Sequence, residues 1–147
     1  MLLALALVTA LLLRHRDRGP VAVSPPSPSG SAAGTCRALH DVLPASVDGA
    51  DRRSTSPAGD LTAAWGRPPV VLRCGVPRPA ALEPTSQLVT IDGVDWFPEH
   101  LSDGYRFTSY GRVADVEVRV PGAYAPEVNP LVDLAAAMKK ADPLKVS

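Results

Sequence analysis

The sequence predicts a single α+β domain, in which an antiparallel sheet of about five strands carries an N-terminal and a C-terminal helix packed on one face. Three observations lead to this prediction. An Asp92-Gly93 dipeptide stands between two apolar runs, which is the pattern of a tight β-hairpin. Residues 113–120 alternate apolar and polar side chains, as a strand with one solvated face does. Residues 129–140 repeat apolar side chains at helical spacing.

Composition divides the 147 residues into four segments. Residues 1–18 are an apolar run that ends in basic residues, and residues 19–34 are a linker rich in Pro, Ser and Gly. Residues 35–143 have the mixed composition of a globular domain, and residues 144–147 form a short tail. About 110 residues are enough for one hydrophobic core, so we expect a single domain between residues 35 and 143.

The N-terminus is typical of a membrane anchor or a signal segment. Residues 1–13 contain one polar side chain, that of Thr9, and lead into a basic cluster at residues 14–18. Thirteen residues at about 1.5 Å each reach roughly 20 Å, less than the roughly 30 Å of bilayer hydrocarbon. We therefore expect the natural start to lie upstream of Met1. Taken literally, a basic cluster after the apolar run favours the alternative, a domain in the cytoplasm.

Two cysteines, Cys36 and Cys74, both fall inside the expected domain. An even number of cysteines in a small exported domain predicts a disulfide, and the alternative is two buried thiols. A bridge across this 38-residue separation would contribute about 4 kcal/mol in the chain-entropy description. With the linker, the cysteines favour a domain held outside the cytoplasm by a single N-terminal anchor. Secretion after cleavage is the alternative.

Charge argues against nucleic acid as a partner. The chain has 15 basic and 15 acidic residues, so its formal net charge is zero, and the basic residues are spread along the sequence. A nucleic-acid-binding domain would gather them on one face. The expected partners are an envelope protein or a cell-wall component, with the membrane contacted through the N-terminus.

In the N-terminal half of the domain, Thr35 is expected to cap a helix that ends before Pro44. Cys36, Leu39 and Leu43 recur on one face of this helix. The segments that follow are expected to be a weak strand over residues 46–48, a loop over 51–59, a helical turn over 60–65 and a buried central strand over 69–74.

In the C-terminal half, two hairpins and a helix are expected. The first hairpin joins residues 87–91 to 94–97, and Glu99 and His100 then lie in a loop after Pro98. The remaining elements are a second hairpin of residues 105–110 and 113–120 around Gly111-Arg112, and a helix capped by Asn129 with Pro130 in its first turn.

A series of short phrases along the domain has the order found in a known family. The phrases are Cys36-Arg37-Ala38-Leu39, Ser56-Pro57-Ala58-Gly59, Ala64-Trp65-Gly66, Leu72-Arg73-Cys74-Gly75-Val76-Pro77-Arg78-Pro79, Pro84-Thr85-Ser86, Gly93-Val94-Asp95-Trp96-Phe97-Pro98 and Ala123-Tyr124-Ala125-Pro126. In this order the chain resembles the actinobacterial domain-of-unknown-function family 3515 over about residues 35–134. The resemblance implies an N-terminal membrane helix and an outward-facing domain, and it transfers no catalytic residue.

Ionisable residues gather around the first hairpin. Asp92, Asp95, Glu99 and His100 could supply an acid and a base, or two or three metal ligands. Nothing in their spacing fixes a convergence, so we interpret them as solvated turn and loop residues. The sequence has no serine-nucleophile motif, phosphate loop or zinc-ligand spacing. We predict no catalytic residue, cofactor or metal.

Arginine and aromatic side chains give the better candidates for a binding surface. Arg73 stands in a strand that looks buried, so its guanidinium must reach water along the side chain, pair with a carboxylate such as Asp95 or Glu117, or hold an anionic ligand. Both tryptophans, Trp65 and Trp96, are expected in the core more than on the surface. The candidate surface consists of Arg73, Arg78, Asp95, Trp96, Glu99 and His100.

The function predicted from these features is a non-catalytic interaction or structural module of the cell envelope. The alternative is a small cell-wall hydrolase or ligand-binding enzyme that acts through Asp95, Glu99 and His100.

Overall fold

The main sheet has eight strands, all paired antiparallel, in a computed structural model that describes residues 1–16 and 19–146. The α+β class is therefore confirmed, and the expected number of about five strands is wrong. In their order across the sheet, the strands are β2 (Ser46–Val47), β3 (Ala50–Arg53), β5 (Thr62–Trp65), β6 (Val70–Cys74), β10 (Val116–Pro121), β9 (Gly104–Ser109), β8 (Val94–Leu101) and β7 (Val89–Ile91).

Two of the strands occupy segments expected to be irregular or helical. β3 lies at the start of the segment expected to be a loop, and β5 replaces the expected helical turn. All four residues of β5 are buried, and the strand pairs with β3 on one side and β6 on the other. The expected helical turn over residues 60–65 is therefore wrong.

The first hairpin is confirmed, because β7 pairs with β8 through a turn in which Asp92 and Gly93 both have positive φ, 47° and 84°. β8, however, continues to Leu101, so Glu99 and His100 lie on a strand and not in a loop. β7 pairs only with residues 94–96. Beyond that point β8 forms one edge of the sheet, where a proline such as Pro98 is tolerated.

The second hairpin is also present, and β9 pairs with β10. The expected two-residue turn at Gly111-Arg112 is wrong, since six residues connect the strands. They leave the sheet to hold the C-terminal helix. The Arg112 guanidinium donates to the carbonyl oxygen of Asp142 at 2.7 Å, and the Ala114 N–H donates to the Asp142 carboxylate at 3.0 Å.

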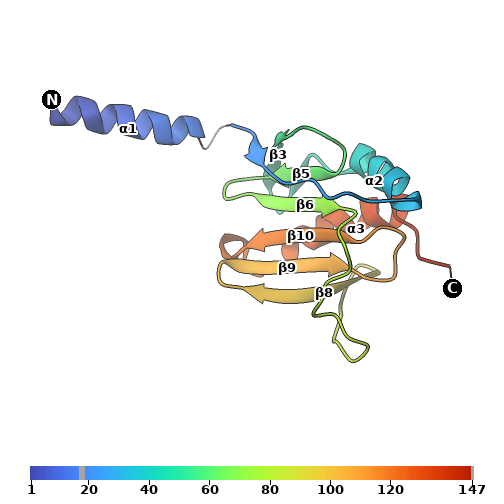
Figure 1. Cartoon of the computed structure of the whole chain (residues 1–147). Coiled ribbons are helices and arrows are strands. Elements are labelled where there is room, and N and C mark those ends of the chain that lie inside the picture. Colours follow the sequence, from blue (N-terminus) through green and yellow to red (C-terminus); the bar gives the residue numbers. More distant parts are fainter. Residues whose placement is uncertain (17–18, 147) are drawn as a thin grey trace.

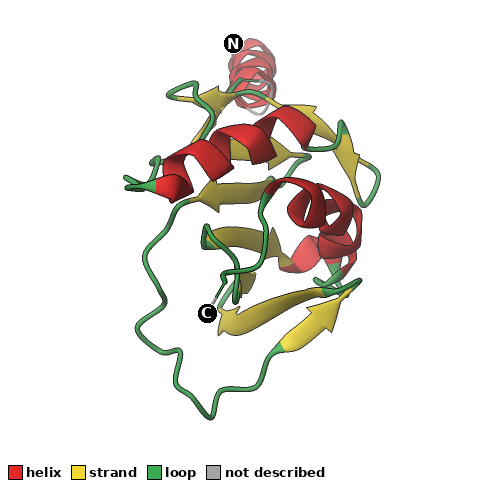
Figure 2. Ribbon diagram, turned by 90° about the vertical axis from the view of Figure 1, so that its right-hand side faces the viewer, coloured by secondary structure: helices red, strands yellow, loops and turns green. Residues whose placement is uncertain are grey.

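Two helices, α2 (Ser31–Val42) and α3 (Asn129–Ala141), lie on the same side of the sheet (Figure 2). α2 begins after Gly30, so Thr35 lies inside the helix and does not cap it. A short 3₁₀ turn, η1 (Gly122–Tyr124), precedes α3. The fully buried large side chains between helices and sheet include Leu39, Trp65, Leu72, Trp96, Leu131, Leu134 and Met138.

A disulfide joins α2 to the end of β6, as predicted. Cys36 and Cys74 are 0% and 1% exposed, and their Cα atoms lie 5.6 Å apart. The bridge therefore lies inside the core and fixes the first helix of the domain to a central strand.

α1 (Leu2–Arg16) stands apart from the sheet (Figure 1). Its leucines and Val8 are each more than half exposed. Within the described residues, no helix has the length and apolar character needed to cross a membrane.

Residues 19–30, which we call the strap, lie across the sheet on the face opposite α2 and α3 (Figure 1). In the strap, β1 (Val21–Ala22) pairs in parallel with β4 (Thr55–Ser56), and Val23 and Pro26 are buried. This segment is part of the expected linker. Its prolines favour extended backbone, and that backbone bonds to the domain, because Arg73 and Arg53 donate to the carbonyl oxygens of Ser24 and Gly19.

Candidate functional site

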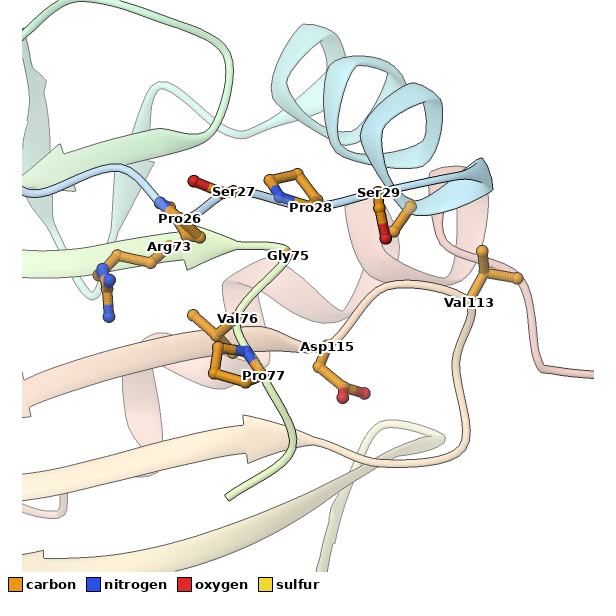
Figure 3. A pocket seen from close by; sticks show the side chains of 11 residues that line it. Pro26, Ser27, Pro28, Ser29, Arg73, Gly75, Val76, Pro77, Val113 and Asp115 are labelled. Atoms are coloured by element: carbon orange, nitrogen blue, oxygen red, sulfur yellow. The ribbon is translucent and has the colours of Figure 1, made fainter. Parts of the chain in front are cut away.

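A groove of about 460 Å³ runs between the strap and the end of β6, and we call it the strap groove (Figure 3). Figure 3 shows Arg73 towards one end and Asp115 towards the other, with Val76 and Pro77 between them. The lining residues are Pro26, Ser27, Pro28, Ser29, Ala32, Arg73, Gly75, Val76, Pro77, Val113 and Asp115.

Strand alternation and one glycine shape this groove. Leu72 and Cys74 point into the core, so Arg73 between them points to the strap face, where its Nε donates to the Ser24 carbonyl oxygen at 2.9 Å. Gly75 has φ +87°, and a Cβ there would come within 2.4 Å of the Cβ of Pro28. Only glycine combines this backbone conformation with so close an approach of the strap.

A second groove, of about 370 Å³, continues from the first over the strands and is called the sheet groove. Arg73, Val76 and Pro77 line both grooves. The remaining residues of the sheet groove come from the loop after β6 and from β8, β9 and β10, and they are Pro79, Ala80, Ala81, Glu99, Arg106, Thr108 and Glu117.

The floor of the sheet groove is made of ion pairs between neighbouring strands. Arg73 lies 3.3 Å from Glu117, its direct partner across β6 and β10. Arg106 donates two hydrogen bonds to Glu99, at 2.9 and 3.1 Å. The hydrogen bond to Glu99 raises the pKa of Arg106 above its ordinary value. Both carboxylates of the sheet groove are thus held by guanidinium groups, which leaves neither as a free general acid or base.

Asp115 in the strap groove, unlike Glu99 and Glu117, is not held by an arginine. It is half-buried, and no donor within the described part of the chain hydrogen-bonds to its carboxylate. Burial raises its pKa, and the charges of Lys145 and Arg78 lower it by less. A half-buried acceptor without a donor is suited to a cationic or N–H group of a ligand.

Residues 1–145 match the model of a family described as Protein of unknown function (DUF3515). The chain belongs to the DUF3515 family. Neither the curated proteins nor the solved structures contain a significant match to it. The DUF3515 match extends beyond the residues that carried the resemblance in sequence, and it includes α1 and the strap.

The structure brings two of the six candidate surface residues of this DUF3515 domain together in the sheet groove, Arg73 and Glu99. Of the two carboxylates expected as partners of Arg73, Glu117 makes the ion pair. Asp95 lies on β8, separated from β6 by two strands, and accepts a hydrogen bond from Thr90.

The other candidates point elsewhere. Trp96 is 0% exposed. The prediction that it belongs to a binding surface is therefore wrong, and the prediction that it lies in the core is confirmed. His100 alternates with Glu99 along β8 and packs on the edge of the Tyr105 ring, with centroids 5.0 Å apart. Arg78 lies over the Tyr110 ring beside the grooves. The carboxylates and imidazole of the first hairpin therefore do not converge.

Among the described residues, no group of three or more His, Cys, Asp or Glu side chains could hold a metal ion. Sequence reasoning also missed Asp115 as a site residue. The alternation of residues 113–120 predicts a solvated position for Asp115, whereas it is half-buried and lines the groove beside the strap and the loop after β6. A pattern of apolar residues within the strap, Val21 and Val23, was the available sign that this segment folds onto the sheet.

Proposed function

We propose that this DUF3515 chain is a non-catalytic interaction module of the cell envelope, held at the membrane by α1. Its domain stands outside the cytoplasm and binds an extended segment of a partner protein along the strap groove and the sheet groove. The observation that carries the proposal is the half-buried Asp115 carboxylate, which has no hydrogen-bond donor among the described residues.

The strap supports an extended peptide as the ligand. The strap is itself an extended, proline-rich segment on this sheet face, held through a backbone carbonyl by Arg73 and through the contact of Pro28 with Gly75. A partner segment of similar conformation can lie beside it, against the apolar wall of Val76 and Pro77. A basic residue of that segment would donate a hydrogen bond to the Asp115 carboxylate.

The ion pairs favour binding over catalysis. A hydrolase needs a carboxylate or imidazole that is free to transfer a proton at the reacting atoms. In the sheet groove, Glu99 and Glu117 are each held by an arginine. Such paired charges give a binding surface a fixed pattern of donors and acceptors, which contributes to specificity more than to affinity.

The disulfide and α1 support the proposed location. Disulfides persist in oxidising compartments and are rare in the cytosol. The apolar side chains of α1 are exposed all around the helix, which leaves them available to lipid. The family match includes this helix.

Site-specific crosslinking in intact cells tests the binding surface. A photoreactive residue at Pro77, which lines both grooves, is expected to form an adduct with a defined envelope protein. The same residue at Val132, exposed on α3 across the sheet, should not form this adduct. Asp115→Asn should reduce the Pro77 adduct about 5-fold to 10-fold, as expected for a lost charge-assisted hydrogen bond.

The matched control is Asp133→Asn, which neutralises an exposed carboxylate on α3 and should leave the Pro77 adduct unchanged. Adducts that form equally from Pro77 and Val132, or that survive Asp115→Asn at full yield, would contradict binding in the strap groove.

Thiol labelling tests the location separately. Ala136→Cys places a thiol on the exposed face of α3, while Cys36 and Cys74 stay bridged and buried. A membrane-impermeant maleimide is expected to label this variant to the same extent in intact cells as after lysis. Labelling that requires lysis would show a cytoplasmic domain, and the wild-type chain, which has no free cysteine, provides the background.

A further inference from the structure

The C-terminal tail, residues 142–146, pairs with residues 111–114 of the segment that connects β9 to β10. We call this pairing the latch. The two segments run antiparallel, and backbone hydrogen bonds join them as in a short sheet. These bonds run from the Val113 N–H to the Pro143 carbonyl oxygen at 3.0 Å and from the Lys145 N–H to the Gly111 carbonyl oxygen at 2.8 Å.

Asp142 holds the latch at the end of α3. Its carboxylate accepts a hydrogen bond from the Ala114 N–H at 3.0 Å, and its carbonyl oxygen accepts from the Arg112 guanidinium at 2.7 Å. Asp142 is 0% exposed. The position of Ala114 therefore depends on a carboxyl group that has no access to water.

Asp115 connects the latch to the strap groove (Figure 3). It follows Ala114 directly, and its side chain lines the groove. Its backbone carbonyl oxygen accepts from the N–H groups of Gly75 and Val76, at 2.9 and 3.1 Å, and both of these residues line the same groove. A displacement of Ala114 would therefore displace both the Asp115 carboxylate and the groove wall that the Asp115 backbone holds.

The surroundings of Asp142 suit a neutral carboxyl group better than a charged one. One of its oxygens is buried and has no hydrogen-bond partner among the described residues, so ionisation would leave charge on an unsatisfied atom. Burial is the main cause that raises the pKa of Asp142 to about 6. A change of pH between about 5 and 7 therefore changes the charge at the latch.

Among the described residues, the charged groups that act on Asp142 come from the segment that it holds. The charge of Arg112 favours the ionised form of Asp142, and the charge of Asp115 opposes it. Ionisation of Asp142 thus places a second negative charge close to Asp115, which favours separation of the two. The other charged side chains on the neighbouring elements are exposed, and they are Lys139 and Lys140 on α3, Lys145 in the tail and Asp92 in the hairpin turn.

We infer that the latch is a pH-sensitive switch of the strap groove, in which protonated Asp142 holds Asp115 in its binding position and ionised Asp142 releases it. The site then binds its partner more weakly at neutral pH than at mildly acidic pH. This inference deepens the proposed function and rests on it for the partner. The movement of the latch is a property of the chain alone and can be measured without a partner.

The first test is a pH titration of the full chain in neutral detergent micelles, followed by amide NMR signals. The Ala114 N–H reports the hydrogen bond to Asp142, and the N–H groups of Gly75 and Val76 report the position of the Asp115 carbonyl oxygen. All three signals are expected to shift in one step with a midpoint near pH 6. A step confined to Ala114 would show that the latch does not reach the groove, and it would overturn the inference.

Three variants identify the group that causes the step. Asp142→Asn should abolish it, and the variant should fold because the amide oxygen still accepts from Ala114. Asp115→Asn should keep the step and lower its midpoint, since a like charge is removed. Asp133→Asn, which neutralises an exposed carboxylate on α3, is the matched control and should leave the step unchanged. A step that persists in Asp142→Asn, or no step in the wild type, overturns the inference.

The second test measures the effect on binding, with the photoreactive residue at Pro77 in intact cells. The adduct of the otherwise wild-type chain is expected to fall at least 2-fold between about pH 5.5 and about pH 7.5, whereas with Asp142→Asn the yield should be the same at both. Equal yields from the wild type would contradict the switch. If no adduct forms at any pH, the proposed function fails while the NMR step still shows the latch, so the two failures are distinguishable.

Discussion

Replacing Cys36 and Cys74 together with alanine is expected to lower the free energy of unfolding of the domain by about 4 kcal/mol. The bridge closes a 38-residue loop, and removing it gives the unfolded chain the conformational freedom that the bridge had restricted. The loop contains β2, β3, β4 and β5, so this freedom is restored over one side of the sheet. A loss of this size is a large part of the stability of a domain of about 110 residues.

Urea unfolding at neutral pH measures this loss, and the reduced wild-type chain provides the control. Reduction opens the loop but leaves both sulfur atoms in the core, whereas the alanine variant also removes buried volume. Both proteins should be destabilised, the alanine variant by the larger amount. A double variant within 1 kcal/mol of the oxidised wild type would show that the bridge stabilises the fold little.

Features that depend on neighbouring residues in sequence could be predicted. The Asp92-Gly93 turn needs two adjacent residues that tolerate positive φ, and both have it. The apolar stripe of α3 repeats within one segment, and the helix was expected within a few residues of its observed bounds. With only two cysteines, the disulfide had a single possible pairing.

Features that depend on distant partners could not be predicted. β5 is a strand because β3 and β6 lie on its two sides, and its own four residues carry no alternating pattern. Similarly, the strap folds onto the sheet because β4 and Arg73 offer it hydrogen-bond partners. Polar, proline-rich composition indicates that a segment lacks a core of its own, but it does not exclude binding to another segment's core.

In the candidate site, too, local features could be predicted and features that depend on distant strands could not. A carboxylate partner for Arg73 was one of the three outcomes that a charged side chain in an apolar strand allows, and the ion pair with Glu117 is the one that the structure shows. The choice between Glu117 and Asp95 depended on strand order and register, which place Glu117 directly opposite Arg73. Asp115 is half-buried because the strap lies beside it, and this burial could not be deduced from the sequence of its own strand.

Asp142, at the end of α3, is expected to make the stability of the domain depend strongly on pH. Its side chain is 0% exposed. Its carboxylate accepts a hydrogen bond from the Ala114 N–H at 3.0 Å through one oxygen. The other oxygen is buried and has no hydrogen-bond partner among the described residues. Burial is the main cause that raises the pKa of Asp142 from 3.8 to about 6, against the smaller opposing effects of the Ala114 bond and the charge of Arg112.

A raised pKa means that the native state binds the proton of Asp142 more tightly than the unfolded chain does. The stabilisation from this proton is complete below about pH 4 and is lost as the pH rises through about 6. At roughly 1.4 kcal/mol per pKa unit, ionisation of this one group lowers the free energy of unfolding by up to about 3 kcal/mol between pH 4 and pH 7.

Asp142→Asn is expected to remove this pH dependence, because the amide oxygen can still accept from Ala114 and the side chain cannot ionise. In urea unfolding, the variant and the wild type should have similar stability at pH 4, and the variant should be the more stable at pH 7 by up to about 3 kcal/mol. The variant gains stability at neutral pH because the pKa of Asp142 is raised in the native state. A salt-bridged carboxylate with a lowered pKa would give the opposite result, a loss at pH 7.

Asp133→Asn on the same helix is the matched control. Asp133 is exposed and accepts from the Asp48 N–H, so its neutralisation should change stability little, and the variant should keep the pH dependence of the wild type because it keeps Asp142. Parallel pH profiles of the wild type and Asp142→Asn would mean that the carboxylate is already ionised and satisfied in the native state. In that case Arg112, whose guanidinium donates to the Asp142 carbonyl oxygen, would be stabilising the charge as well as the end of α3.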